Sequence, residues 1–314
     1  MRAVAVDRFG AEPRLMDLPA PRPGADELLV RIRAAGLNPA DWKIAAGLFG
    51  ADIPHRFPLI LGNDAAGVVE QVGAEVAGFA PGDRVYGQFM RTGDGLGGYC
   101  EYGVVAVSGT VSPIPEGMTF VQAAAIPTAS MTAYNLVDTA GVDDDRTVLV
   151  VGATGGVGRS VVQLAADRSA RVIATARPDA AEDLRDLGAV ATVDPGAGSL
   201  VEQFRSVHPD GIDILIDLVS DAAELDALSR LVRPAGVVVT SVFTADVDAL
   251  ADRGIRAVNL DNEPSSALLD TLTELFVTGR LRIDVEREVP LAEAPEALRR
   301  NRSGGARGKT VIVV

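Results

Sequence analysis

The chain up to about residue 120 carries short apolar runs that glycine and proline interrupt repeatedly. The clearest strand candidates are residues 28–34, 65–72, 84–87 and 104–107. Few segments here are long and periodic enough for a helix, and turn-forming residues separate the runs. The pattern therefore predicts an irregular β-barrel with binding loops in this half of the chain.

The pattern changes near Thr119. An alanine-rich stretch, residues 121–136, predicts a helix that is interrupted at Pro127. Beyond it, apolar strand candidates alternate with helical patterns at residues 181–187 and 222–232. The strand candidates are residues 147–151, 171–175, 191–193, 212–218 and 236–242. Such alternation predicts parallel strands joined by crossover helices, which is a doubly wound sheet buried on both faces.

A chain of 314 residues exceeds the size of most single cores and predicts two domains. The change in pattern places one domain over residues 1–120 and the other over residues 121–262. Helical stretches follow at residues 266–278 and 293–300. Strand candidates lie at residues 283–289 and 310–314. The predicted fold class is α/β.

The formal net charge of −14 disfavours attraction to phosphate backbones and anionic lipid, so we expect no nucleic-acid partner and no membrane partner. The first residues lack the apolar core of a signal peptide, which predicts a cytoplasmic protein. The chain has one cysteine, Cys100, and two histidines, His55 and His208. These cannot form an internal disulfide or a Cys/His zinc cluster. We expect His55 in a loop and His208 on the surface.

The strongest local signal is the apolar run 147–151, which leads into a glycine-rich turn and then a helical pattern at 159–167. Small residues allow a tight turn and close approach of a pyrophosphate, which would meet free N–H groups at the helix start. The expected cofactor contacts are Ala153, Thr154, Gly155, Gly156, Val157 and Gly158. Because strand, turn and helix follow in this order, the motif predicts a dinucleotide site rather than an ordinary turn.

The strand candidate 171–175 bears on the choice of dinucleotide. Sites that prefer NAD place an acid at the end of this strand, where it binds the ribose 2′-hydroxyl. Here Ala176 and Arg177 follow the strand, and a guanidinium can pair with a 2′-phosphate. This favours NADPH, although Asp179 is a nearby acid and Arg177 could also be an ordinary surface charge.

Several motifs in a fixed order resemble those of the medium-chain dehydrogenase/reductase superfamily, and within it the zinc-independent quinone oxidoreductases. They are Asn38-Pro39-Ala40-Asp41-Trp42-Lys43, Leu61-Gly62-Asn63-Asp64-Ala65-Ala66-Gly67-Val68-Val69, Pro81-Gly82-Asp83-Arg84-Val85-Tyr86-Gly87, Gly97-Gly98-Tyr99-Cys100-Glu101-Tyr102 and the glycine-rich turn. The similarity runs essentially end to end. It implies a GroES-like catalytic domain, completed by residues 263–314, and a Rossmann domain that binds NADPH. Relatives commonly pair through their nucleotide-binding sheets, so the resemblance also implies a homodimer.

The resemblance bears on metal binding. The catalytic zinc ligands of related alcohol dehydrogenases fall here on Asn38, Asn63 and about Thr128, none of which is a good zinc ligand. The four-cysteine lobe that holds structural zinc in those relatives is also missing, because Cys100 is the only cysteine. We therefore expect no metal site, and we interpret Cys100 as a packed residue rather than a nucleophile.

The resemblance implies that residues 38–43 form a loop that lines the cleft holding the nicotinamide. Asn38 and Asp41 would orient groups near the ring or the substrate, and Lys43 would support the developing enolate electrostatically or supply a proton. Trp42 would offer the substrate a stacking surface. Each has an alternative: the Asn-Pro and Asp residues make a good turn, tryptophan packs in cores and lysine is usually solvated.

Four further residues are expected at the cofactor by the same resemblance. Thr132 would lie against the nicotinamide, with helix packing as its alternative role. Val242 and Phe243 lie at the end of the strand candidate 236–242, where their backbone would bind the carboxamide and their side chains would cover the ring. Phe243 would also contact the substrate, with core packing as its alternative role. Lys309, just before the last strand, would approach the cofactor, although a solvated lysine is the default.

Together these observations predict hydride transfer from NADPH to a quinone or to the β-carbon of an enone, with protonation by water or a cleft residue. Two isolated histidines cannot supply a Ser/His/Asp arrangement. One alternative is an enoyl-thioester reductase that acts on an acyl carrier substrate. Another is a protein that binds NADPH as a redox sensor without turnover, whereas the acidic balance disfavours RNA binding.

Overall fold

The computed structural model describes residues 1–49, 54–304 and 307–314, and it divides into two compact units. Unit 1 comprises Met1–Ala129, Pro264–Val277 and Ile283–Val314, and unit 2 comprises Ser130–Glu263 and Thr278–Arg282. Unit 1 thus extends beyond the expected boundary at residue 120. The reason is that α2 (Phe120–Ala125) packs on the strands of unit 1.

Unit 1 is built on two β-sheets. One has the strand order β2-β1-β4, and the other has the order β15-β16-β3-β5-β6-β8, with β7 also paired to β3. The strands are β1 (Arg2–Val6), β2 (Arg14–Asp17), β3 (Glu27–Gly36), β4 (Leu59–Ile60), β5 (Asp64–Val72), β6 (Arg84–Gln88), β7 (Tyr102–Ala106), β8 (Val111–Pro113), β15 (Val285–Pro290) and β16 (Lys309–Val313). The C-terminal strands therefore complete the sheet that the N-terminal residues begin.

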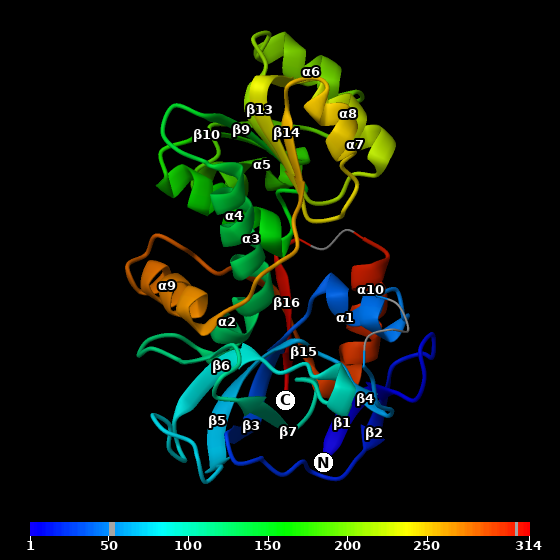
Figure 1. The fold of residues 1–314 in the computed structure, drawn as a ribbon, viewed down its shortest axis with the longest axis vertical. Helices are drawn as coiled ribbons and strands as arrows, with labels where there is room; N and C mark the ends of the chain where they lie inside the picture. The colour runs from blue at the N-terminus through cyan, green and yellow to red at the C-terminus, as the bar shows by residue number, and fades with distance from the viewer. Residues whose placement is uncertain (50–53, 305–306) are drawn as a thin grey trace. The chain divides into compact units, whose positions relative to one another are not determined.

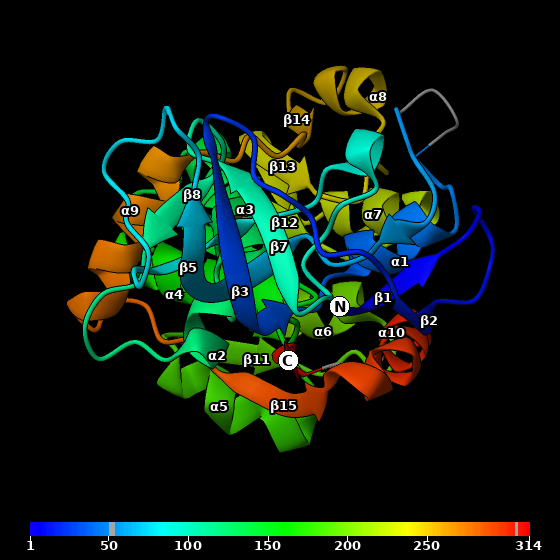
Figure 2. The ribbon, with the colours of Figure 1, turned by 90° about the horizontal axis from the view of Figure 1, so that it is seen from below.

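The longest strand of unit 1, β3, organises the sheet. Its sequence is mainly apolar, and its polar side chains Arg31 and Arg33 are the exposed positions. It pairs in antiparallel fashion with β5, β7 and β16, and Figure 2 shows it lying between β5 and β7. Because its carboxyl end pairs with β16, it brings the chain near residue 38 next to the last strand.

Four helices and two 3₁₀ turns lie wholly in unit 1, within the described ranges. They are α1 (Pro39–Ala45), α2, α9 (Ser266–Val277), α10 (Ala294–Arg302), η1 (Thr92–Asp94) and η3 (Leu291–Glu293). The segment expected as a loop at residues 38–43 is helical instead. Pro39 occupies the first helical turn, and the Asp41 carboxylate accepts a hydrogen bond from the Asn38 amide at 2.8 Å, which stabilises the helix start.

Unit 2 is a parallel sheet covered by helices, as Figure 1 shows. Its strand order is β11-β10-β9-β12-β13-β14, and every pair is parallel. The strands are β9 (Thr147–Val151), β10 (Arg171–Thr175), β11 (Ala191–Val193), β12 (Ile212–Asp217), β13 (Val232–Thr240) and β14 (Arg256–Asn259). The helical segments are α3 (Pro127–Ala140, which begins in unit 1), α4 (Gly156–Asp167), η2 (Pro178–Ala180), α5 (Ala181–Asp186), α6 (Leu200–Val207), α7 (Ala222–Ser229) and α8 (Val247–Ala251). The predicted doubly wound fold is confirmed.

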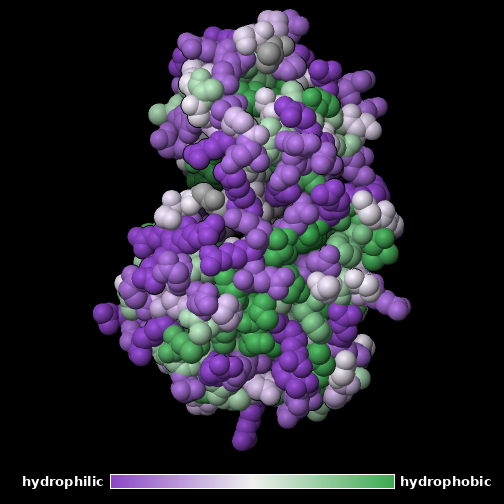
Figure 3. Space-filling model, turned by 180° about the vertical axis from the view of Figure 1, so that it is seen from behind, coloured by the Kyte–Doolittle hydropathy of each residue, from purple (hydrophilic) through white to green (hydrophobic). Residues whose placement is uncertain are grey.

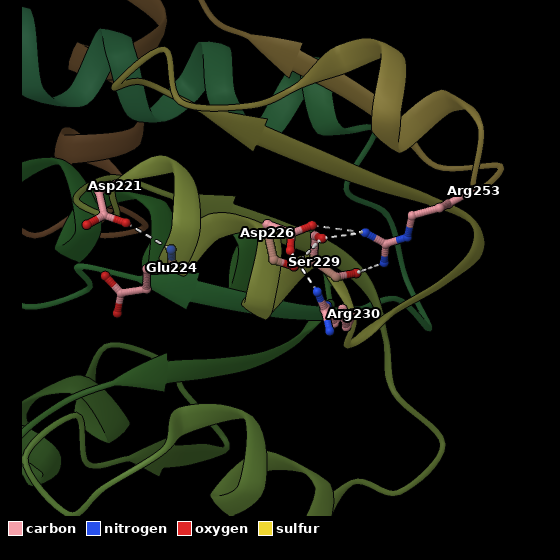
Figure 4. Close-up of polar contacts among 6 residues, drawn as sticks. All are labelled: Asp221, Glu224, Asp226, Ser229, Arg230 and Arg253. Carbon is pink, nitrogen blue, oxygen red and sulfur yellow. Dashed lines mark hydrogen bonds and ion pairs between the residues drawn. The ribbon is translucent and has the colours of Figure 1, made fainter.

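The expected elements of unit 2 differ from the observed ones mainly where β13 begins. The helix expected at 222–232 ends at Ser229, and β13 starts at Val232 with an irregular register instead of at residue 236. Arg253 stabilises this helix end by donating to the Ser229 hydroxyl and carbonyl at 2.7 and 3.0 Å (Figure 4). The elements α6, α8 and β14 were not expected from the sequence.

The two histidines lie in different units, His55 in unit 1 and His208 in unit 2. The His55 ring packs against Phe9 and Phe57, with ring centroids 4.6 and 5.3 Å away, and His208 follows α6 with its ring 5.1 Å from that of Phe204. Hydrophilic side chains cover much of the face in Figure 3, as the acidic composition suggests. Within the described ranges, no helix combines the length and apolarity needed to cross a bilayer.

The close packing of α2 on β3 can be tested at Gly36. A Cβ atom there would collide with the backbone carbonyl of Ala124 and approach the Asp64 side chain to 3.3 Å. We expect Gly36→Ala to lower the free energy of unfolding by roughly 1–3 kcal/mol, because the backbone must move. Urea denaturation followed by circular dichroism measures this effect.

Gly93→Ala is the matched control, because the nearest atom to its added Cβ would be a Pro54 carbon at an ordinary 3.6 Å. It should leave the unfolding midpoint unchanged or raise it slightly. Equal midpoints for the two variants would contradict the packing argument.

Candidate functional site

Unit 1 contains a continuous chain of hydrogen bonds that begins at a buried lysine. Lys309 Nζ donates to Asn38 Oδ1 at 2.7 Å and to the Leu37 carbonyl at 2.9 Å. Asn38 Nδ2 then donates to Asp64 Oδ2 at 2.8 Å. Lys309, Asn38 and Asp64 are 6%, 3% and 0% exposed. The default interpretation of Lys309 as a solvated charge is therefore wrong, because the fold encloses its ammonium group.

The chain of hydrogen bonds continues from Asp64 to Thr128. The Thr128 hydroxyl donates to Asp64 Oδ1 at 2.6 Å, and its backbone N–H donates to Asp64 Oδ2 at 3.0 Å. Two side-chain amides, Asn63 Nδ2 and Gln88 Nε2, donate to the same hydroxyl oxygen at 2.9 and 3.2 Å. We refer to Lys309, Asn38, Asp64, Thr128, Asn63 and Gln88 as the polar network.

The charges within the polar network stabilise each other. Burial raises the pKa of Asp64, while Lys309 and the hydrogen-bond donors oppose this rise. Burial lowers the pKa of Lys309, and the nearby carboxylates of Asp64 and Asp41 counteract it. Because each ion offsets part of the other's desolvation cost, removing one would leave an uncompensated buried charge.

Asp41 holds the start of α1 beside this network. Its side chain is 0% exposed and accepts hydrogen bonds from the Asn38 amide, the Asn63 amide at 3.0 Å and the Tyr99 hydroxyl at 2.6 Å. Burial raises the pKa of Asp41 to about 6, despite these three donors. The carboxylate thus fixes the backbone of both asparagines, and Tyr99 is a member of the cluster that the sequence did not single out.

Within the described ranges, the side chains of Trp42 and Lys43 make hydrogen-bond and ring contacts only with residues outside the polar network. The Trp42 indole N–H donates to Asn301 Oδ1 at 3.1 Å, and its ring lies 5.8 Å from Lys43 Nζ and 5.6 Å from the Arg302 guanidinium carbon. Trp42 also lines a small cavity of about 60 Å³ next to α10. The structure therefore brings together Asn38, Asp41 and Lys309 among the predicted residues, whereas Trp42 and Lys43 form a separate stacked pair.

The expected zinc-ligand positions also meet in the polar network. Asn38 and Thr128 both bind Asp64, and Asn63 binds Thr128. Amide and hydroxyl groups are weak ligands for zinc, which prefers thiolate, imidazole and carboxylate. Across the described ranges, no three His, Cys, Asp or Glu side chains are grouped as a metal site would require. Zinc independence stays a prediction.

Unit 2 carries the glycine-rich turn between β9 and α4. Gly155 precedes the first residue of the helix, Gly156, so the first N–H groups of α4 have no partner inside the helix. A Cβ atom on Gly158 would collide with the Gly152 carbonyl and lie 2.5 Å from the Ala153 Cα. The turn is therefore packed tightly, and it suits a pyrophosphate at the helix start.

The strand order places this turn at a topological switch point. The connection from β9 runs to β10 on one side, whereas β12 lies on the other side of β9. Ligands of such sheets bind beyond the carboxyl ends of the strands at this point. The described turn, residues 153–158, thus lies where the fold favours a dinucleotide, and the residues of the turn fit one.

Three more predicted residues follow the carboxyl ends of these strands. Arg177 comes two residues after β10, is exposed, and makes no ion pair with any residue that the structure describes. Val242 follows β13, and its N–H donates to Thr240 Oγ1 at 3.1 Å. Phe243 is 61% exposed and has a φ of 62°, a strained conformation for a bulky side chain. Such strain in an exposed aromatic residue is typical of a functional position.

Thr132 lies on α3, partly buried, and the structure shows no hydrogen bond to its hydroxyl among the described residues. Sequence reasoning missed Val219, which is 63% exposed just beyond β12 and contacts the position of Gly152. It also missed Asp64, Tyr99 and Gln88. The family motifs at 61–69 and 97–102 contain two of these, but only the fold shows that they meet.

Asp41 gives a pH-dependent prediction. Its pKa of about 6 in the folded protein exceeds the ordinary 3.8, so the folded state binds more protons between these pH values. Its contribution to stability is therefore complete below pH 4 and is lost as the pH rises to about 6. Relative to wild type, Asp41→Asn should gain up to about 3 kcal/mol of unfolding free energy between pH 4 and pH 7.

Denaturation curves of both proteins at several pH values measure this difference. Asp26→Asn, at an exposed position, is the control and should follow the wild-type pH dependence. A constant difference between wild type and Asp41→Asn across the range would contradict the assignment.

Comparison with known proteins agrees with this geometry. Residues 24–127 match the family model of the alcohol dehydrogenase GroES-like domain, and residues 187–312 match that of the zinc-binding dehydrogenase. The chain is 32% identical over 331 residues to NAD(P)H oxidoreductase RTN4IP1, mitochondrial, of Homo sapiens, covering 92% of this chain and 82% of that protein. It is 30% identical over 329 residues to Quinone-oxidoreductase QR1, chloroplastic, of Triphysaria versicolor, covering 99% and 98%.

A solved structure shares the fold throughout. The quinone oxidoreductase from Coxiella burnetii superposes with a TM-score of 0.90 at 29% identity, covering 100% of this chain and 99% of that one. The relatives therefore match both units and not one alone. The chain belongs to the quinone oxidoreductase-like family of the medium-chain dehydrogenase/reductase superfamily, and it is an oxidoreductase that uses a nicotinamide cofactor.

Proposed function

We propose that this chain is a zinc-independent oxidoreductase that uses NADPH to reduce quinones or α,β-unsaturated carbonyl compounds. The polar network carries the proposal. Asn38, Asn63 and Thr128 stand at the positions expected for zinc ligands. Asn38 and Thr128 both donate to Asp64, and Asn63 donates to Thr128, so their polar groups bond to one another. The names of the two quinone oxidoreductases among the relatives agree with this acceptor class.

The network suits the reduction of a conjugated carbonyl better than the oxidation of an alcohol. An alcohol must lose its hydroxyl proton to a base, but both carboxylates here are already occupied by hydrogen-bond donors. A conjugated carbonyl accepts hydride readily and needs only donors for the oxygen that becomes negative. Amide N–H groups near an ammonium charge provide such donors.

In this proposal the dinucleotide is held by unit 2, where Ala153, Thr154, Gly155, Gly156, Val157 and Gly158 would contact the pyrophosphate. When bound, the cofactor supplies the hydride. Thr132, Val242 and Phe243 would contact the nicotinamide, and Arg177 the 2′-phosphate. Asn38, Asp41 and Lys309 would act from unit 1, where they hold donor groups in fixed orientations. A homodimer and a cytoplasmic location stay predictions from the sequence.

The direct test of the activity is NADPH oxidation, followed by absorbance, with a panel of quinones, enones, enals and enoyl thioesters. The protein is first dialysed against a chelator. We expect turnover with quinones or enones that zinc addition does not increase. Preferential turnover of enoyl thioesters would favour a thioester reductase, and tight NADPH binding without turnover of any acceptor would favour a redox sensor. Activity that disappears with the chelator and returns with zinc would refute the proposal.

Arg177 tests the choice of NADPH. Its guanidinium is exposed beside Ala176, and charge-assisted hydrogen bonds to a phosphate contribute about 1.5–3 kcal/mol. Arg177→Ala should weaken NADPH binding about 10- to 100-fold and leave NADH binding within about twofold. Calorimetric titration with both nucleotides measures the two affinities.

Arg171→Ala is the matched control, because Arg171 is an exposed arginine at the opposite end of the same strand. It should bind both nucleotides as the wild type does. Equal losses of NADPH and NADH affinity in Arg177→Ala would remove this account of cofactor choice.

A further inference from the structure

The two buried charges of the polar network determine which group donates and which accepts in each of its hydrogen bonds. The Lys309 ammonium can only donate, so the Asn38 oxygen must face it and the Asn38 amide nitrogen must face Asp64. Asp64 then accepts hydrogen bonds from the Asn38 side-chain amide, the Thr128 backbone N–H and the Thr128 hydroxyl. Three donors around one carboxyl group suit its ionised form. The order of donors and acceptors therefore fixes the orientation of the Asn38 amide.

The order of donors and acceptors also determines how the side-chain amides of Asn63 and Gln88 are oriented. The single hydroxyl proton of Thr128 is used on Asp64, at 2.6 Å, so its oxygen can only accept from other groups. Asn63 and Gln88 must therefore turn their NH₂ groups toward it, as they do at 2.9 and 3.2 Å. Their carbonyl oxygens are excluded from this position, because two oxygens without a proton between them repel.

An NH₂ group has two N–H bonds, and Thr128 uses only one from each side chain. The structure shows no second acceptor for either group among the described residues, and both side chains are only partly buried, unlike Asn38 and Asp64. The backbone fixes their spacing: Gln88 pairs with Asp64 in the sheet, and the Phe89 N–H donates to the Asn63 carbonyl at 2.7 Å. The two amide nitrogens thus meet at Thr128 Oγ1, and each keeps one N–H that Thr128 does not use.

We infer that Asn63 and Gln88 together bind the carbonyl oxygen of the acceptor through these remaining N–H groups. The inference rests on the proposed function and names the residues that touch the acceptor. They are catalytic because the negative charge that develops on this oxygen strengthens both hydrogen bonds. Asp64, Thr128 and Lys309 are positioning residues, which act by holding the amides in the donating orientation.

Reduction of an enone at this site combines hydride addition with a later proton transfer. The cofactor would supply hydride, with its two electrons, from the C4–H bond of its dihydronicotinamide; that bond would break as a bond to the β-carbon forms, and NADPH would become NADP⁺. The carbon–carbon π pair shifts to form an enolate, whose oxygen lies against the Asn63 and Gln88 N–H groups. Water then supplies a proton to the α-carbon, which gives the saturated carbonyl product. For a quinone, the same oxygen belongs to the hydroquinone monoanion before its protonation.

The test compares Asn63→Ala, Gln88→Ala and the control Gln71→Ala, which removes an exposed amide from β5. We expect the kcat for an enone to fall about 100-fold in each of the first two variants, since that is the effect of losing one such donor. KM should change little, because the hydrogen bonds strengthen mainly in the transition state. The Kd for NADPH, measured by calorimetry, and the melting temperature should match those of the control.

A comparison of acceptors separates this role from a structural one. A quinone delocalises the negative charge over its ring, so its oxygen needs less support than that of a simple enone. The two variants should therefore lose less kcat with a quinone than with an enone, whereas a distorted site would lose both equally. Gln88→Glu is a second variant: its kcat should rise as the pH falls, because only the protonated carboxyl can donate.

The outcomes are distinguishable from those for the proposed function. If the wild type binds NADPH but reduces no carbonyl acceptor, the proposed function fails and this inference fails with it. If the wild type turns over enones and both alanine variants keep the control kcat, the inference alone is overturned. A loss of kcat that is equal for enone and quinone, with no pH response in Gln88→Glu, would also overturn it.

Discussion

The burial of an ammonium and a carboxylate in unit 1 is the constraint on which the candidate site depends. Removing either Lys309 or Asp64 from water costs several kcal/mol per ion, and the fold offsets this cost with the opposite charge and hydrogen bonds. Asn38 lies between the two and binds both, at 2.7 and 2.8 Å. A lysine only donates hydrogen bonds, and a carboxylate only accepts them. Turning the Asn38 amide around would therefore break its hydrogen bonds to both Lys309 and Asp64.

This constraint joins distant parts of the sequence. Lys309 begins β16, whose pairing with β3 aligns Val311 with Gly36, and the chain continues from Gly36 to Asn38 and the start of α1. Thr128 arrives with α3, and close contact at Gly36 lets α2 pack beside the strands. The return of the C-terminal residues to unit 1 therefore does more than close a sheet, because it delivers the cation that the buried carboxylate needs.

The sequence predicted the strands of unit 2 well, because apolar runs such as 147–151 and 171–175 have one stable place in a sheet covered on both faces. It predicted α1 poorly, since Asn-Pro and Asp favour both a turn and a helix start. The burial of Lys309 and Asp64 could not be predicted from the sequence. A lysine or an aspartate is normally solvated, and only the three-dimensional pairing of residues far apart in the chain makes burial favourable.

The two units satisfy their polar groups in opposite ways, and the contrast fits a division of labour. In unit 1 both carboxylate oxygens of Asp41 and of Asp64 accept hydrogen bonds from the protein, which holds the donor groups around them in fixed orientations. In unit 2, Val219 and a strained Phe243 are exposed beyond the carboxyl ends of their strands, and the first N–H groups of α4 have no partner within the helix. A ligand that covers exposed apolar surface removes that surface from water, and a ligand that accepts from the first N–H groups of α4 replaces water as their partner. The inner groups of unit 1 already have protein partners. The physical logic is therefore that unit 2 gains from binding a large ligand, and unit 1 gains from holding its shape.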